Sequence, residues 1–340
     1  MTSPRRYWFA IHPDIRKPIG GVKQIHRLAE ALAHCGRQAT LIQEQADFHP
    51  GWFESQVDTI SLASWRQRSD LDPRRDVVVL PETFLPSLPS YGPGLPKLMF
   101  NQNGSYSFGF REGDGFPETA EAVLNLYSHS DLAHVLCVSQ HDQELLERGF
   151  SLGSHRVSRL INAIETDLFQ PSSGKKGRVL SYMPRKNSRD VAIVAALLRQ
   201  QPWFEGWTLM PIQGMPQTDV AQRLQRSLGF LAFGHPEGFG LPLAEAAACG
   251  CALIGYSGLG GRELLAMARS QKVGWEVDYG DWQGFLHATE ALISSVQKQP
   301  QTVVSQLQAL SDQVRDHYSW AAMVKSVERA LPRWESQLPV

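Results

Sequence analysis

The 340-residue sequence lacks several features that identify whole classes of protein. Its formal net charge is −1 at pH 7, so no overall positive field draws it to nucleic acid or acidic lipid. No run approaches the roughly 20 apolar residues that cross a bilayer, and the first residues lack the apolar core of a signal peptide. We therefore expect a cytoplasmic protein without a nucleic-acid partner or transmembrane segment. Its oligomeric state and peripheral contact with the inner face of a membrane stay open.

Cysteine is also scarce, with four residues in the chain. Cys249 and Cys251 are separated by one residue, which is too close for the usual zinc-ligand spacing, and no group of histidines accompanies them. The Asp-Leu-Asp triplet at 70–72 has the look of a metal-binding motif, but it precedes Pro73 and a predicted strand, where turn chemistry explains it better. We expect reduced cysteines, no metal and no cofactor.

What the chain does have is a repeated alternation of strand-like and helix-like segments. Strand-like segments lie at 7–11, 39–43, 76–80, 97–101, 135–139, 178–182, 208–213, 230–233 and 252–256. Helical spacing of apolar residues falls between them, for example at 22–34 and 241–249. This alternation predicts an α/β protein built from two doubly wound, Rossmann-like parallel-sheet domains with a cleft between them.

The boundary between the two predicted domains follows from composition. Residues 169–177 consist mainly of Pro, Ser, Gly and Lys and contain few large apolar residues, which is typical of a linker. We therefore assign residues 1–168 to an N-terminal domain and residues 178–319 to a C-terminal domain.

The most informative stretch is 235–265, which predicts a loop, a helix, a strand, a second loop and a second helix. Gly238 and Gly240 allow the backbone to approach a ligand closely and leave N–H groups exposed where the helix begins, which suits an anion. Glu237 precedes this helix and Glu245 lies within it, so both are expected near the carboxyl ends of the strands, where open α/β sheets bind ligands. Taken singly, Glu245 could serve only to favour the helix dipole.

The whole string resembles the signature of retaining glycosyltransferases of family 4, which have the GT-B architecture. The matching residues are Glu237-Gly238-Phe239-Gly240, Glu245, Ala248-Cys249-Gly250, Gly260-Gly261 and Glu263. Further matches at Ser139, Arg148-Gly149, Val157, Asn162 to Glu165, Phe169 and Pro171 extend the likeness over most of the chain.

The resemblance implies a role for each matched element. Glu237 would contact hydroxyl groups of the donor sugar and Glu245 the ribose, with the loop 238–240 closing on the donor. The helix at 320–340 would cross back and complete the N-terminal domain, and no metal would be required.

A nucleotide-sugar donor brings a diphosphate, whose leaving oxygen gains negative charge as the bond to the sugar breaks. By the resemblance, Arg185 and Lys186 after the first strand of the second domain would hold that diphosphate, although the lysine of the family usually comes several residues later. A solvated basic turn explains Lys186 equally well. Gly20-Gly21 would approach the same phosphates from the N-terminal domain, and a tight turn is its plain alternative.

The sequence departs from the family where a histidine often follows a strand of the first domain. Asn101, Gln102 and Asn103 stand there, and amides bind sugar hydroxyls but are not bases near neutral pH. They could equally cap a turn. We assign the acceptor side to His12, Asn101, Asn103 and Tyr106, in a loop that runs to Phe110.

The sequence thus predicts a retaining, metal-independent glycosyltransferase. It would move a sugar from a nucleotide-diphosphate sugar to a glycan, glycolipid or other hydroxyl acceptor. Two alternatives stay open, namely a sugar phosphorylase or epimerase on the same fold and a non-catalytic nucleotide- or carbohydrate-binding protein.

Overall fold

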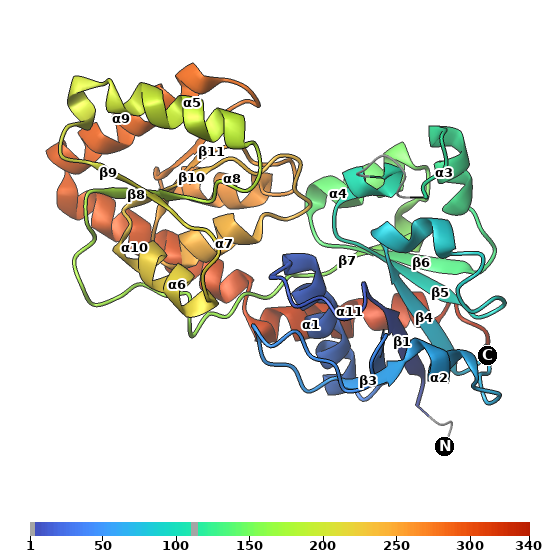
Figure 1. Cartoon of the computed structure of the whole chain (residues 1–340). Helices are drawn as coiled ribbons and strands as arrows, with labels where there is room; N and C mark the ends of the chain where they lie inside the picture. The colour runs from blue at the N-terminus through green and yellow to red at the C-terminus, as the bar shows by residue number, and fades with distance from the viewer. Residues whose placement is uncertain (1–3, 110–114) are drawn as a thin grey trace. The chain divides into compact units, whose positions relative to one another are not determined.

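The computed structural model describes residues 4–109 and 115–340, and the chain divides into two compact units (Figure 1). The first unit comprises Met1–Ala163 together with Ala321–Val340, and the second comprises Ile164–Trp320. Each unit contains its own parallel sheet, and we describe the two separately.

Within the described residues, the first unit has a seven-stranded parallel sheet in the order β3-β2-β1-β4-β5-β6-β7. The strands are β1 Arg6–Ala10, β2 Gln38–Gln43, β3 Asp58–Ser61, β4 Asp76–Pro81, β5 Lys97–Asn101, β6 Leu132–Cys137 and β7 Val157–Arg159. The helices are α1 Gly20–His34, α2 Leu62–Arg66, α3 Ala120–Leu126, α4 Gln140–Glu144 and α11 Trp320–Glu335, with short 3-10 turns η1 Glu82–Ser87 and η2 Gly104–Phe108. Strand β4 is buried on both faces, as its unbroken apolar sequence predicts.

The C-terminal helix α11 is fastened to the first unit by a buried polar cluster. Trp334 is fully buried and its Nε1 donates to the hydroxyl of Tyr7 on β1 at 3.1 Å. That hydroxyl donates to the carboxylate of Glu335 at 2.8 Å, and Arg37 also donates to both oxygens of Glu335. Because these contacts join the last helix to the first strand, the two ends of the chain belong to one core.

Within the described residues, the second unit has a five-stranded parallel sheet in the order β12-β11-β10-β8-β9. The strands are β8 Val179–Tyr182, β9 Thr208–Pro211, β10 Gly229–Ala232, β11 Ala252–Gly255 and β12 Gly274–Glu276. The helices are α5 Ser188–Arg199, α6 Gln217–Arg226, α7 Leu241–Ala248, α8 Arg262–Ser270, α9 Trp282–Lys298 and α10 Pro300–His317. The predicted alternation of strands and helices is confirmed in both units, and β3, β7 and β12 are strands that the sequence did not predict.

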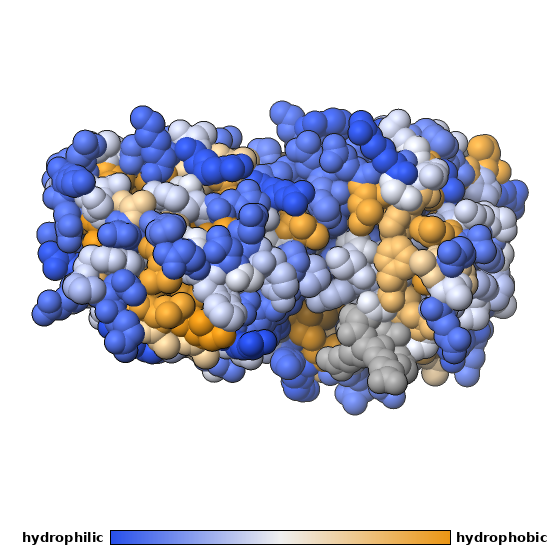
Figure 2. Space-filling view, turned by 90° about the horizontal axis from the view of Figure 1, so that it is seen from above, coloured by the Kyte–Doolittle hydropathy of each residue, from blue (hydrophilic) through white to orange (hydrophobic). Residues whose placement is uncertain are grey.

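The surface in Figure 2 carries mostly hydrophilic side chains, and its hydrophobic patches are interrupted by polar residues. Among the described residues, no helix combines the length and apolar character that crossing a bilayer requires.

The segment before β8, predicted to be a linker, is anchored by Phe169, which is fully buried, and by Lys176. The ammonium group of Lys176 donates to the carbonyl oxygens of Ser227 at 2.9 Å and Cys249 at 2.8 Å. It also approaches the carbonyls of Leu224 and Gln225, at 3.4 and 3.2 Å. These oxygens belong to the carboxyl-terminal ends of α6 and α7, where helix carbonyls lack partners and a positive charge is favourable.

We therefore expect Lys176→Met to destabilise the second unit by about 2 kcal/mol, because several carbonyls lose a charged donor. Urea denaturation of the purified protein measures the change in the unfolding midpoint. Lys175→Met is the matched control, since Lys175 is exposed. Equal midpoints for the two variants would show that the Lys176 contacts do not stabilise the fold.

Candidate functional site

The centre of the candidate site is the loop between β10 and α7. The backbone N–H of Glu237 donates to the carbonyl of Gly258 at 2.7 Å, and the N–H of Gly260 donates to the carbonyl of Glu237 at 2.9 Å. This isolated parallel bridge joins the loop after β10 to the loop after β11. Glu237 is therefore fixed at the carboxyl ends of two central strands, where the sequence predicts it.

Glycines make this close approach of two loops sterically feasible. A Cβ atom on Gly258 would lie 2.6 Å from the Cβ of Glu237, and one on Gly234 would lie 2.8 Å from its Oε1. A Cβ on Gly260 would overlap the carbonyl group of Gly238. The side chain and backbone of Glu237 are thus enclosed by positions that only glycine fills without a shift.

The start of α7 carries a row of available N–H donors. Gly240 adopts a left-handed conformation, with φ +88°, and precedes the helix without a side-chain cap. Within the part of the chain that the structure describes, the backbone N–H groups of residues 238–241 donate to no other residue. Four consecutive donors at a helix start are suited to a phosphate group.

Phe239 contributes to this site through its backbone. Its ring is 4% exposed and packs edge-on against Tyr318, with ring centroids 4.9 Å apart. The side chain therefore packs the loop against the second unit, and the part of Phe239 left to interact with a ligand is its backbone N–H group.

Glu245 is half-buried in the second turn of α7. The effect of a charge on the helix dipole falls off within the first turn. A role limited to favouring the helix dipole therefore explains Glu245 less well.

The two basic residues after β8 have different surroundings. The ammonium of Lys186 lies 2.9 Å from Oε1 of Glu237 and donates to the carbonyl of Pro236, also at 2.9 Å. Arg185 is exposed and, over the described ranges, makes no hydrogen bond or ion pair. The structure therefore brings Lys186 together with Glu237 and leaves the guanidinium of Arg185 available to a ligand.

Three residues around this loop were missed at the sequence level. His235 stacks on the exposed ring of Tyr279, with centroids 4.3 Å apart, and burial together with the charges of Lys186 and Arg262 lowers the pKa of His235. Asn187 donates to the carbonyl of His235 at 3.2 Å. A lone Asn or His carries no local signal of such contacts, because they join segments far apart in the sequence.

In the first unit, His12 and Gly20-Gly21 lie near the carboxyl ends of β1 and β5. Nε2 of His12 is 2.9 Å from the hydroxyl of Thr83, and burial lowers the pKa of His12. Gly21 is in contact with Gln102, whose side-chain amide donates to its carbonyl at 3.2 Å. Gly20-Gly21, predicted to lie in a loop, instead forms the start of α1, and it lies beside the segment Asn101-Gln102-Asn103.

The predicted acceptor residues at and after the end of β5 differ in their exposure and contacts. Asn101 is fully buried and donates to Ser107 and Tyr127, so this predicted acceptor residue is sequestered inside the unit. Asn103 caps η2 by accepting from the N–H of Ser105, which is the turn-capping alternative. Tyr106 is half-exposed, and Phe110 lies outside the described residues.

Two buried carboxyl groups organise this segment and were also missed. Glu82, 3% exposed, accepts from the N–H of Gln102 at 2.9 Å, and burial raises its pKa to about 8. Asp142 accepts from the N–H of Gly104 at 3.3 Å, and burial raises its pKa to about 7. Both side chains hold backbone donors of the loop that follows β5.

The Asp-Leu-Asp triplet is occupied by structural ion pairs. Asp70 pairs with Arg6 and Arg68, and Asp72 pairs with Arg74. Among the described residues, no group of three or more His, Cys, Asp or Glu side chains is arranged to hold a metal.

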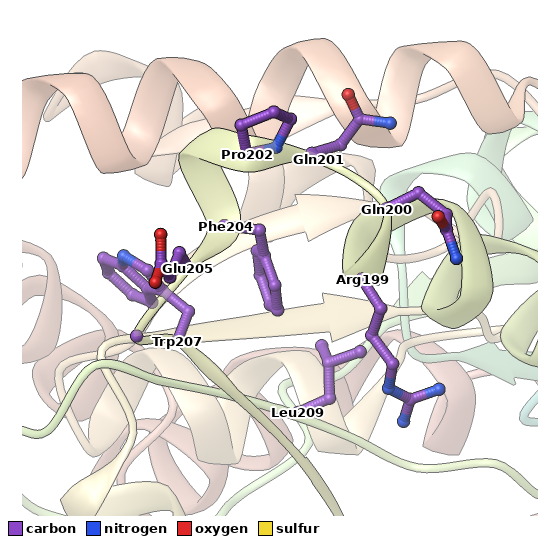
Figure 3. Close-up of a pocket in the computed structure, with 9 residues that line it drawn as sticks. Arg199, Gln200, Gln201, Pro202, Phe204, Glu205, Trp207 and Leu209 are labelled. Atoms are coloured by element: carbon purple, nitrogen blue, oxygen red, sulfur yellow. The ribbon is translucent and has the colours of Figure 1, made fainter.

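A cavity of about 410 Å³ lies at a different edge of the second unit (Figure 3). It is lined by the end of α5 at Arg199, by the turn containing Phe204 and Glu205, and by Trp207 and Leu209 where β9 begins. Because it borders the amino end of β9, it is separate from the carboxyl-end loops that carry Glu237 and Arg185.

The glycine contacts yield a direct prediction. Gly260→Ala should lower the free energy of unfolding by about 3 kcal/mol, because the new methyl group meets backbone atoms of Gly238 that cannot move aside cheaply. Urea denaturation followed by circular dichroism measures the loss. Gly174→Ala is the control: like Gly260, Gly174 has no left-handed φ, but its Cβ would meet only Oγ of Ser172, at 3.7 Å. A Gly260 variant as stable as this control would show that the two loops need not interlock.

No family model matches the sequence, and no curated protein matches it at the sequence level. Solved structures match over nearly the full chain. A sucrose-phosphate synthase from Thermosynechococcus elongatus has a TM-score of 0.71 at 14% identity and covers 98% of this chain and 99% of its own. HepE from Anabaena, solved with UDP, has a TM-score of 0.68 at 13% identity, covering 96% and 99%.

A glycosyltransferase from Rickettsia africae has a TM-score of 0.66 at 12% identity and covers 99% of both chains. Identities this low establish similarity of fold alone. With two parallel-sheet units and full-length matches of this kind, the chain has the GT-B fold.

Proposed function

We propose that this protein is a glycosyltransferase that moves a sugar from a nucleotide-diphosphate sugar to a hydroxyl acceptor, with retention at the anomeric carbon and without a metal ion. The observation that carries the proposal is the row of unpartnered N–H groups at residues 238–241, flanked by Glu237 and Glu245 at the carboxyl end of a parallel sheet.

The donor diphosphate is assigned to the start of α7 and to Arg185. The helix start supplies N–H donors and the positive end of the helix dipole, and the exposed guanidinium of Arg185 supplies a full positive charge. Fixed positive groups of this kind lower the barrier, because they stabilise the charge that grows on the leaving oxygen.

The donor sugar and ribose are assigned to the two glutamates. A carboxylate has four acceptor positions and can bind neighbouring hydroxyl groups of a sugar, which suits Glu237 in its fixed loop. Glu245 on α7 is assigned to the ribose. HepE, one of the proteins of similar fold, has been solved with UDP and with UDP-glucose, which supports this class of donor.

The reaction breaks the bond between the anomeric carbon and the phosphate oxygen and forms a bond from the same face of that carbon to the acceptor oxygen. The proton of the acceptor hydroxyl passes to the leaving phosphate oxygen. This route needs no protein base, which agrees with amides standing where the family often has a histidine. The acceptor, a glycan, glycolipid or other hydroxyl compound, is assigned to the strand ends of the first unit near His12, Gln102 and Tyr106.

A panel of nucleoside diphosphates tests the proposal through thermal unfolding. A ligand at 100 times its dissociation constant stabilises the folded state by about 2.7 kcal/mol, which is readily measured. The corresponding nucleotide sugar is then incubated with acceptors, with and without EDTA, and the anomeric configuration of the product is determined. Binding without turnover under any condition would favour a non-catalytic binding protein, and sugar phosphate or isomerised donor as product would favour the other rivals on this fold.

Glu237→Gln should lower kcat/KM about 10- to 100-fold, because a neutral amide replaces a charged acceptor of the donor hydroxyls, a change of roughly 1.5–3 kcal/mol. Steady-state kinetics measures the loss. Glu205→Gln, an exposed carboxyl at the far edge of the same unit, is the matched control. Equal activity of the two variants would remove Glu237 from the reaction.

A further inference from the structure

The turn between β8 and α5 presents two adjacent cations to different surroundings. Lys186 is half-buried, and its ammonium bridges Oε1 of Glu237 and the carbonyl of Pro236 at 2.9 Å each. Arg185 beside it is exposed and pairs with no residue in the described part of the chain. The two side chains therefore do not act as one positive patch.

Asn187, like Lys186, donates to backbone carbonyls of the loop that ends at Glu237. It adopts a left-handed conformation, with φ +51°, and its side-chain amide donates to the carbonyl of Phe233 at 2.7 Å and of His235 at 3.2 Å. Two consecutive side chains of this turn thus bind the backbone of the loop that ends at Glu237.

The remaining sides of Glu237 are already closed. Gly234 and Gly258 lie so near its side chain that a Cβ at either position would come within 3 Å of it. Lys186 supplies the contact on the carboxylate itself, so its charge sets where Oε1 points. An ammonium has three donors, and two of those of Lys186 are engaged by Oε1 and the Pro236 carbonyl.

We propose that Lys186 is a positioning residue for Glu237 and not a ligand of the donor phosphates, so that Arg185 is the cation of this turn that meets the diphosphate. This inference rests on the proposed function, because it concerns the same donor site. It separates a sugar-directed side of the turn from a phosphate-directed side.

Binding of UDP and UDP-glucose, or of the pair that the nucleotide panel selects, distinguishes the two roles by calorimetry. Lys186→Met should leave the affinity for the nucleoside diphosphate within about twofold and weaken the sugar-bearing donor about 10-fold, or 1.4 kcal/mol, because only the sugar contacts Glu237. Arg185→Met should weaken both ligands by a similar factor. Lys186→Arg, which keeps the charge, should recover part of the loss.

A loss of diphosphate affinity in Lys186→Met as large as that in Arg185→Met would overturn the inference. The inference would also be overturned if the unaltered protein bound the nucleoside diphosphate and the nucleotide sugar equally well and Lys186→Met reduced neither kcat nor donor binding.

A second measurement needs no ligand. Burial and the charges of Lys186 and Arg262 lower the pKa of His235, whereas the charge of Glu237 raises it. Lys186→Met should therefore raise the pKa of His235 in an NMR titration of the imidazole, and Arg185→Met should leave it unchanged. The His235→Gln variant identifies the resonance.

The two measurements fail separately. If the protein binds no nucleoside diphosphate, the proposed function fails while the titration still tests the position of Lys186. If the His235 titration is the same in the unaltered protein and in Lys186→Met, the positioning role is wrong whatever the protein binds.

Discussion

The pair of backbone hydrogen bonds between Glu237 and the segment 258–260 is the constraint on which the candidate site of the second unit depends. Backbone atoms cannot rotate away from one another as side chains can, so this bridge fixes the position of the Glu237 Cα. The next residues must then reach the start of α7 within a short span, which requires the left-handed turn at Gly240. The N–H groups at 238–241 are left without acceptors among the described residues as a consequence, because their own backbone is committed to the turn.

The fold could be predicted largely because its signals are local. Apolar runs such as Val77 to Leu80 predict buried parallel strands, and apolar residues at helical spacing between these runs predict the helices that cover the sheet. The segment 169–177 shows the limit of that reasoning. Its composition is that of a linker, yet Lys176 is anchored by carbonyl oxygens at the ends of two helices. Those acceptors come from positions about 50 and 70 residues away, and no local pattern reveals them.

The candidate site divides in the same way. Glycines and glutamates at set spacings predict the loop at Glu237, because glycine allows backbone conformations and close approaches that other residues do not. The roles of Arg185 and Lys186 could not be separated from sequence, because adjacent cations look alike until the turn is known. The structure distinguishes them, because Lys186 donates to the carbonyl of Pro236 in the neighbouring loop whereas Arg185 is exposed. Asn101 was misassigned for a related reason, since its burial depends on Ser107 and Tyr127 closing over it.

The first unit has few groups that could take a proton from an acceptor. Glu82 and Asp142 have raised pKa values, but both are buried and already accept backbone N–H groups of the loop after β5. His12 keeps an accessible position, but burial lowers its pKa and its Nε2 is hydrogen-bonded to Thr83. These groups shape the strand ends more than they supply a base. In the proposed reaction the leaving phosphate takes the proton, because it gains negative charge at the moment when the acceptor hydroxyl must lose its proton.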